Sequence, residues 1–260
     1  FRMRQWYLFY HQSNAIVAQA VLQIPWGHNV AIMGKASSQT EAEFYVFKTL
    51  ENGWSRNILV HQMESGLFER QGKVVSNFKK ALSSPQSDLA QESLKDPYVF
   101  DFLTLTGRAR ESELEDKLID NITKFLLELG SGFAYVGRQY PLEVSGQDFR
   151  LDLLFYHLKL RCFVVVELKA GDFKPEYAGK MNFYLSAVDN QMRTKADKPS
   201  IGIILCKRKD RIIAEYALHG MVRPIGVSEY KLQKALPKGL QSSLPTPAEL
   251  EKGLRGKKGA

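Results

Sequence analysis

The chain has 260 residues, 44% of them hydrophobic and 25% charged, which is typical of globular proteins with one large domain or two ordinary ones. No apolar stretch approaches the ~20 residues of a membrane helix, and no secretory leader is visible. The composition therefore excludes a membrane-spanning protein and predicts a cytoplasmic one. Cys162 and Cys206 lack the spacing of zinc ligands, which predicts two free thiols.

The net charge of +8 is unevenly distributed along the chain. Residues 1–107 carry 10 basic and 9 acidic side chains, whereas residues 108–260 carry 26 and 19. A surface that binds phosphates needs such an excess of positive charge. The second part of the chain is therefore the candidate for nucleic-acid binding, although many proteins with this charge bind no nucleic acid.

The first part of the chain reads as helical. Thr40 and Glu43 have the spacing of a capping box and predict a helix over 41–51 that ends at a glycine. Ser55 can cap a second helix that runs to about Ser65.

Two helices joined by a short turn that contains a glycine match the outline of a helix-turn-helix. The second helix offers polar side chains suited to DNA contacts, namely Arg56, Asn57, His61 and Gln62. An ordinary helical hairpin with a solvated polar face would show the same pattern, so both interpretations stay open.

Three domains or segments are expected: a mainly helical N-terminal domain over 1–107, a second domain over 108–235 and a partly disordered C-terminal extension over 236–260. The extension ends in a glycine-rich, basic tail. Three loops or breaks precede the second domain, at 83–87, 95–97 and 104–110.

The second domain alternates between helical and strand patterns. The helices are expected at 111–129, 175–188 and 210–218, and the strands at 133–144, 148–157, 161–169, 201–206 and 223–227. Helix, three strands, helix and strand make an αβββαβ order, so the fold class is α/β.

Charged side chains lie within two of these strands, at positions that should be buried. The strand over 163–166 is apolar on both faces, and Glu167 and Lys169 follow it two residues apart, on the same side. Asp152 interrupts an apolar run on the preceding strand. Buried charges are costly unless they pair or bind an ion. The three could converge into an oxygen-rich pocket with one ammonium group, which suits a divalent metal and an activated water.

Asp152 followed by Glu167-Leu168-Lys169 resembles the PD-(D/E)XK nuclease core. The segments FRLDLLFYH, VVVELKAGDFKPEYAGKMNFYL and SIGIILC resemble the YhcG-type proteins of that superfamily, and WSRNIL and KDPYVFDFL resemble the N-terminal domain of the same family. The resemblance implies a restriction-endonuclease-like αβββαβ core with a mixed sheet. It also implies hydrolysis of phosphodiester bonds in DNA with Mg²⁺ or Mn²⁺.

In this interpretation Asp152, Glu167 and the backbone carbonyl of Leu168 hold the metal together with water molecules. Lys169 orients or deprotonates the attacking water and stabilises the charge on the phosphate. The alternative is a buried ion pair between Lys169 and one of the acids, without catalysis.

The helix that follows departs from the family pattern. Many members carry Gln-x-x-x-Tyr there, whereas this chain has Lys180 and Tyr184. Lys180 could meet a phosphate as a point charge, and Tyr184 could touch DNA or close the helix against the sheet.

A third acid is expected from the helix over 111–129. With about 100° per residue, Glu111 and Glu115 fall inside the apolar arc that contains Leu114 and Leu118, and Glu113 falls opposite. The first helix of this superfamily commonly contributes an acid to the metal through water. Glu115 is the prediction, with Glu111 in reserve because it lies at the start of the helix.

DNA is the expected partner, RNA is not excluded, and a homodimer stays open. The alternative function is a catalytically inactive module with a nuclease fold that binds nucleic acid or another protein.

Overall fold

The computed structural model describes residues 2–11, 15–103 and 110–232. The predicted connection over 104–110 and the predicted C-terminal extension therefore lie almost wholly outside the described residues. None of the helices in the described ranges is long and apolar enough to cross a bilayer.

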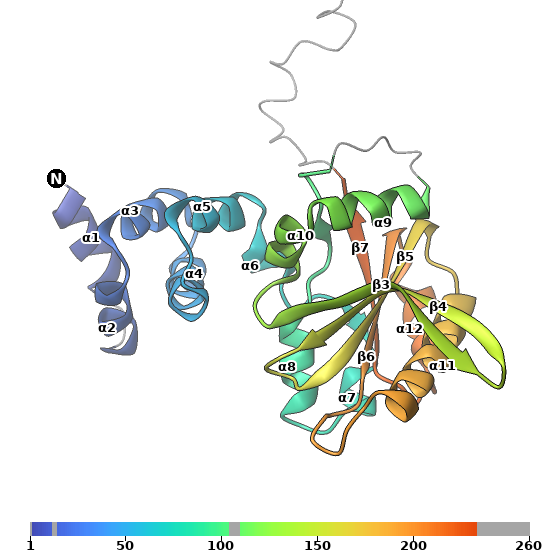
Figure 1. The fold of residues 1–260 in the computed structure, drawn as a ribbon. Coiled ribbons are helices and arrows are strands. Elements are labelled where there is room, and N and C mark those ends of the chain that lie inside the picture. The colour runs from blue at the N-terminus through green and yellow to red at the C-terminus, as the bar shows by residue number, and fades with distance from the viewer. Residues whose placement is uncertain (1, 12–14, 104–109, 233–260) are drawn as a thin grey trace, which may run out of the picture.

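The chain begins with a module of helices, on the left in Figure 1. Its elements are α1 (Arg2–Tyr10), α2 (Ala15–Gln23), α3 (Trp26–Lys35), α4 (Gln39–Asn52), α5 (Arg56–Glu64) and α6 (Leu67–Arg70). They pack around a core of their own, which includes Val21, Ile32, Tyr45, Val46 and Leu59.

The two predicted helix caps of this module had different outcomes. Ser55 caps α5 as predicted, because its Oγ accepts a hydrogen bond from the backbone N–H of Ile58 at 3.4 Å. The cap predicted at Thr40 is wrong, since Ser38 Oγ accepts from the N–H of Glu41 at 3.2 Å and α4 begins at Gln39. The true cap lies two residues earlier and has the same Ser-x-x-Glu spacing.

Within the described residues, seven strands form one mixed sheet in the order β1-β7-β6-β5-β4-β3, with β2 paired to β7 (Figure 1). The strands are β1 (Val75–Ser76), β2 (Tyr98–Val99), β3 (Phe133–Val144), β4 (Gln147–His157), β5 (Cys162–Asp172), β6 (Ile201–Arg208) and β7 (Ile225–Lys231). Neighbours β3, β4 and β5 are antiparallel, while β5, β6 and β7 are parallel.

Helices cover both faces of this sheet. One face packs against α7 (Phe78–Ala81), α8 (Gln86–Ser93), α9 (Glu111–Asp120) and α10 (Ile122–Leu129). The other packs against α11 (Glu176–Gln191) and α12 (Arg211–Leu218). The predicted αβββαβ order is confirmed, with α9 and α10 as the first helix and α11 as the second.

Several predicted boundaries differ from the structure, among them the following. The helix predicted over 111–129 is interrupted at Asn121, whose φ of −115° and ψ of 33° are not helical. The loop predicted over 83–87 is shortened, because α8 starts at Gln86. The strand predicted to end at 227 continues to Lys231, where it pairs with β2.

The segment over 71–103 belongs with the sheet and not with the helical module. Its side chains Val74, Phe78, Leu94 and Tyr98 lie in the core on the α9 face of the sheet. The chain therefore passes from the core of the helical module to the core of the sheet domain near residue 70. The sequence had placed this boundary at residue 107.

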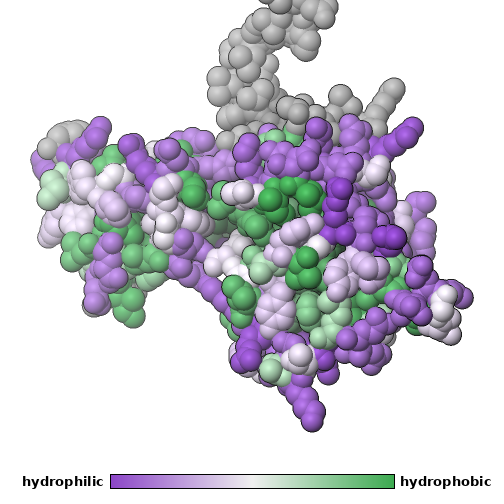
Figure 2. All heavy atoms as spheres, viewed as in Figure 1, coloured by the Kyte–Doolittle hydropathy of each residue, from purple (hydrophilic) through white to green (hydrophobic). Residues whose placement is uncertain are grey.

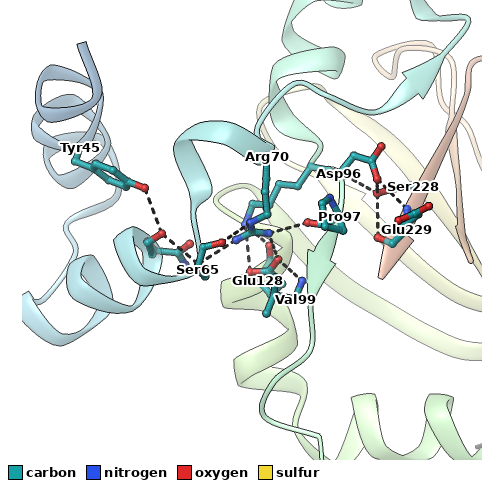
Figure 3. A network of polar contacts seen from close by, with 11 residues as sticks. Tyr45, Ser65, Arg70, Asp96, Pro97, Val99, Glu128, Ser228 and Glu229 are labelled. Carbon is teal, nitrogen blue, oxygen red and sulfur yellow. Dashed lines mark hydrogen bonds and ion pairs between the residues drawn. The ribbon is translucent and has the colours of Figure 1, made fainter. Parts of the chain in front are cut away.

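A buried polar network joins the helical module to the sheet domain (Figure 3). Arg70, at the end of α6, donates to Glu128 Oε1 of α10 at 2.6 Å and to the carbonyl of Pro97 at 2.9 Å. The same carboxylate oxygen accepts from the N–H of Val99 at 2.8 Å. The side chains of Arg70 and Glu128 are 7% and 3% exposed, so this ion pair is almost fully withdrawn from water.

Candidate active site

The site forms where β4 and β5 stop pairing. Leu153 and Val166 are the last residues of the two strands that pair with each other. Beyond them, side chains take the place of the hydrogen bonds between the two backbones. The N–H of Leu168 donates to Asp152 Oδ2 at 2.8 Å, and the N–H of Asp152 donates to Glu167 Oε1 at 3.5 Å. The two carboxylates are therefore held by the backbone of the opposite strand.

The ammonium group of Lys169 lies among these carboxylates, as the sequence predicted. Its Nζ is 3.4 Å from Glu167 Oε2 and 3.8 Å from Asp152 Oδ2, and it donates to the carbonyl of Leu168 at 2.8 Å. The side chains of Glu167 and Lys169 are 2% and 8% exposed, and that of Asp152 is 18% exposed. A hydroxyl that the sequence did not single out completes the arrangement, since Tyr230 donates to the carbonyl of Lys169 at 3.3 Å.

The charges of the site shift one another's pKa values. Burial raises the pKa of Glu167, Asp152 raises it further, and the ammonium groups of Lys169 and Lys180 oppose the rise. Burial alone would lower the pKa of Lys169, but Glu167, Asp152 and Glu111 outweigh it, so the net shift is upward. Without a metal, Lys169 is therefore a cation held by carboxylates.

Lys180 and Tyr184 lie one turn apart on α11, next to the buried acid. Lys180 Nζ donates to Glu167 Oε2 at 3.0 Å and stands 5.0 Å from the centre of the Tyr184 ring. The lysine that replaces the family's usual glutamine therefore bonds a site carboxylate in this structure. Burial opposes the charge of Lys180, yet the nearby Glu167 raises its pKa overall. Tyr184 is buried against the sheet.

Two acids of α9 turn toward the site, and they make different contacts. Glu111 Oε2 is 3.4 Å from Lys169 Nζ, and its Oε1 accepts from the N–H of Ala170 at 3.1 Å. Glu115 is 7% exposed, and its Oε2 accepts from Gln139 Nε2 at 2.6 Å. Burial raises the pKa of Glu115, the Gln139 hydrogen bond lowers it, and Asp152 raises it again.

Both acids thus contact residues of the sheet, as the helical arc predicts, although only Glu115 is buried. Glu113 is exposed. The contact with Lys169 belongs to Glu111, the reserve choice. A role of Glu115 at the metal through water stays a prediction.

Figure 2 shows hydrophilic side chains along the upper edge of the sheet domain, where Figure 1 places α9. The exposed residues of this helix include Glu111, Glu113 and Asp116. The edge beside the site is therefore open to water and to polar ligands.

Oxygen atoms are the donors that this site offers to a metal. Within the described ranges, no group of three or more His, Cys, Asp or Glu side chains is arranged to hold an ion. The carboxylates of Asp152 and Glu167 and the carbonyl of Leu168 remain as a set of two acids and one backbone oxygen. Mg²⁺ is usually bound through one or two carboxylates and several waters, so this donor set fits it.

The polar residues predicted on α5 are only partly available for contacts. Arg56 and Asn57 are exposed, but Gln62 is 2% exposed, so its prediction as a DNA contact is wrong. The side chain of Gln62 is buried in the helical module. Its backbone carbonyl accepts a hydrogen bond from the Tyr45 hydroxyl at 3.3 Å. Arg56 lies on the helical module, apart from β4 and β5 (Figure 1).

An αβββαβ core that carries Asp152 on one strand and Glu167-x-Lys169 on the next defines the PD-(D/E)XK nuclease fold. The profile of the YhcG PDDEXK nuclease domain matches residues 91–245, and that of the DUF1016 N-terminal domain matches residues 1–70. The chain belongs to the YhcG family of PD-(D/E)XK nuclease domains. The match to the DUF1016 N-terminal domain ends where the core of the helical module ends, near residue 70.

Known proteins resemble the chain to different degrees. A relative named "Putative nuclease YhcG" from Escherichia coli (strain K12) is 39% identical over 218 residues, which cover 82% of this chain and 58% of the relative. The chain thus spans less than two thirds of that protein's length.

Two solved structures were also found. One is a repair endonuclease from Pyrococcus abyssi, with a TM-score of 0.33 and 16% identity over 49% of this chain and 48% of the other. The second is an EndoMS–dsDNA complex, with a TM-score of 0.35 and 19% identity over 52% of this chain and 48% of the other.

Proposed function

We propose that this chain hydrolyses phosphodiester bonds in DNA with Mg²⁺ or Mn²⁺. The observation that carries the proposal is the position of Lys169 Nζ, within 3.4 Å of Glu167 and 3.8 Å of Asp152 where two strands part. Burying three charges at one point is costly, and a fold that needed only stability could use apolar residues there. Membership in a nuclease family supports the same conclusion.

Each residue has a distinct task in this proposal. Asp152, Glu167 and the Leu168 carbonyl hold the metal, which when bound acts as a Lewis acid and lowers the pKa of its water. Lys169 donates a hydrogen bond to the attacking water and offsets the negative charge that grows on the scissile phosphate. Glu111 keeps the ammonium group of Lys169 in place from the side of α9.

One observation favours the alternative of an inactive, nuclease-like binding module. Lys169 and Lys180 both lie within 3.4 Å of Glu167 Oε2, so this acid is already neutralised without a metal. In that case the cluster is structural, and the protein binds nucleic acid without cutting it.

Cleavage assays separate the two functions. Duplex, single-stranded and branched DNA and RNA are incubated with the wild-type protein over a range of Mg²⁺ and Mn²⁺ concentrations. We expect metal-dependent cleavage of DNA that falls by about 100-fold or more in Asp152→Ala and Lys169→Met.

Asp148→Asn is the matched control, because Asp148 is an exposed acid on the same strand, outside the site. Equal cleavage by wild type and Asp152→Ala would indicate a contaminant and contradict the enzymatic function. Binding of DNA without cleavage at any metal concentration would favour the inactive module.

Contacts of the helical module with DNA belong to the same proposal. If Arg56 meets a phosphate, Arg56→Ala in the full chain should weaken DNA binding and reduce the slope of log affinity against log salt by about one. An unchanged slope would favour a protein-interaction role for α4 and α5.

A further inference from the structure

Gln139 interrupts β3 with a backbone conformation that strands do not normally contain. Its φ is 43°, in the left-handed region, where a residue with a side chain loses roughly 1–2 kcal/mol. The pairs that flank it are Arg138 with Leu153 and Tyr140 with Leu151, and the register of β3 also shifts nearby, between Tyr135 and Gly137. Gln139 therefore lies across from Asp152, at the point where the site begins.

The left-handed residue turns two successive side chains toward the same helix. In a regular strand, neighbouring side chains point to opposite faces of the sheet. Here Arg138 NH1 bonds Asp116 Oδ1 at 2.6 Å, and Gln139 Nε2 bonds Glu115 Oε2 at 2.6 Å. Both acceptors are consecutive residues of α9. The conformation of Gln139 is what allows its amide to reach this helix.

The hydrogen bond of Gln139 fixes a buried carboxylate beside the site. Glu115 is 7% exposed, and it lies close enough to Asp152 for the two like charges to interact. A buried carboxylate without a donor would be costly and would turn away from another acid. The amide supplies the donor, and it approaches from the strand opposite Asp152.

We propose that Gln139 is a positioning residue, which holds the carboxylate of Glu115 beside Asp152 for the metal-dependent reaction. This inference rests on the proposed function, because Glu115 acts there through water on the metal. A strained backbone conformation at a functional site is kept only when the surrounding structure stabilises it. Here the strained conformation of Gln139 directs its amide toward Glu115. The amide and the backbone conformation can be tested separately.

Two substitutions separate these contributions. Gln139→Met keeps the length of the side chain but removes the donor, while Gln139→Gly removes the donor and relieves the left-handed strain. Asp116→Asn is the control, because it breaks the exposed Arg138–Asp116 pair between the same strand and helix. Mn²⁺ affinity is measured by calorimetry, the cleavage rate in single turnover, and the thermal midpoint without metal.

We expect both Gln139 variants to lose about 10- to 100-fold in Mn²⁺ affinity or cleavage rate, as is usual when a residue supporting a metal ligand is removed. Both variants should lower the thermal midpoint of the metal-free protein, because Glu115 loses its donor, and Gln139→Gly should lower it less than Gln139→Met because it relieves the left-handed strain. Asp116→Asn should bind Mn²⁺ and cut DNA like the wild type. In a Glu115→Gln background, Gln139→Met should add no further loss, because both changes remove one interaction.

The outcomes that contradict the proposal are distinct from failure of the function itself. Wild-type affinity and rate in Gln139→Met, or a full additional loss in the Glu115→Gln background, would overturn the role of Gln139 while leaving the nuclease intact. A wild-type protein that neither binds Mn²⁺ nor cuts any substrate would overturn the proposed function and the role of Gln139 together.

Discussion

At the scale of single residues, Glu167 decides the electrostatics of the site. Its side chain is 2% exposed and lies within 3.4 Å of two ammonium groups, those of Lys169 and Lys180. Burial and the neighbouring Asp152 raise the pKa of this carboxyl, while the two lysines lower it. Each lysine therefore contributes to keeping Glu167 ionised and able to accept a metal.

Replacing Lys180 should destabilise the metal-free protein in a pH-dependent manner. Lys180→Gln replaces the ammonium group beside Glu167 Oε2 with a neutral amide, so the pKa of Glu167 rises further above its ordinary value of 4.5. We expect the variant to lose about 1 kcal/mol at pH 7, because the Lys180 side chain is partly exposed. A carboxyl whose pKa is raised on folding reduces stability in full above its folded-state pKa and not at all below its unfolded-state pKa. The difference should therefore shrink as the pH falls through the pKa of Glu167.

Urea unfolding at pH 7 and at about pH 4 checks this prediction. Lys174→Gln is the matched control, an exposed lysine just before α11, and should show no difference at either pH. A loss in Lys180→Gln that is equal at both pH values would mean that the ion pair with Glu167 is not its cause.

The residues of the site differ in how visible they are in the sequence. Asp152, Glu167 and Lys169 could be predicted, because charges inside apolar strands need a reason. The bond from Lys180 to Glu167 could not, since the family pattern gives a position on α11 and no partner. Gln139 is invisible in the sequence, because its role depends on a backbone angle that no residue pattern specifies.

At the scale of elements, the turn from α10 into β3 is built around two glycines and one buried histidine. Gly130 and Gly132 have φ values of 111° and 101°, which only glycine adopts readily. His157 is 1% exposed, and its Nδ1 accepts from the N–H of Leu160 at 3.1 Å. Burial lowers the pKa of His157 to about 4, so the ring is neutral at pH 7. Its ring packs against Phe133 at the start of β3, with the ring centres 4.7 Å apart.

The two glycines make a matched pair for substitution. A Cβ on Gly132 would lie 2.7 Å from Cε1 of His157, whereas a Cβ on Gly130 would meet nothing within 4 Å. Gly130→Ala should therefore cost only backbone strain, about 1–2 kcal/mol, and Gly132→Ala should cost about 1–3 kcal/mol more because the ring must move. The midpoints of urea unfolding measure both losses, provided that the dependence of the unfolding free energy on urea concentration is unchanged. Equal losses would mean that the histidine shifts freely.

The ends of helices and strands could be predicted where glycines mark them in the sequence. The strand over 133–144 matches β3 at both ends, because glycines precede it and a turn with Gly146 follows it. The interruption at Asn121 was missed, since the apolar arc continues through it. The strands β1 and β2 have two residues each, too few to show any period, and so the segment around them was assigned to the wrong core.

At the scale of the whole molecule, the helical module and the sheet domain are joined by buried and by exposed ion pairs. Arg70–Glu128 is the buried pair, while Lys159 Nζ, after β4, meets Glu51 Oε1 of α4 at 2.6 Å on the surface. Both pairs link the same two parts of the chain. Because the first pair is buried and the second is exposed, we expect their loss to change the free energy of unfolding by very different amounts.

Breaking the buried pair should weaken the junction far more than breaking the exposed one. Arg70→Met leaves the buried Glu128 with the N–H of Val99 and the more distant ammonium group of Lys95, at 3.7 Å, and we expect a loss of about 3–5 kcal/mol. Lys159→Gln should cost about 1 kcal/mol or less. Chemical unfolding followed by tryptophan fluorescence tests both, since Trp54 lies in the helical module. Similar losses in the two variants would mean that the buried network does not carry the junction.

The pairing of β1 and β2 with β7 has a consequence for the protein during its synthesis. Val75 pairs with Val227 and Tyr98 pairs with Tyr230, so the segment over 71–103 acquires its sheet neighbour only when the last strand has been made. At translation rates of about 5–20 residues per second, this delay amounts to roughly seven to thirty seconds. During that time Phe78 and the other apolar side chains of the segment have no completed core to enter. We therefore expect this segment to need protection from aggregation until β7 has left the ribosome.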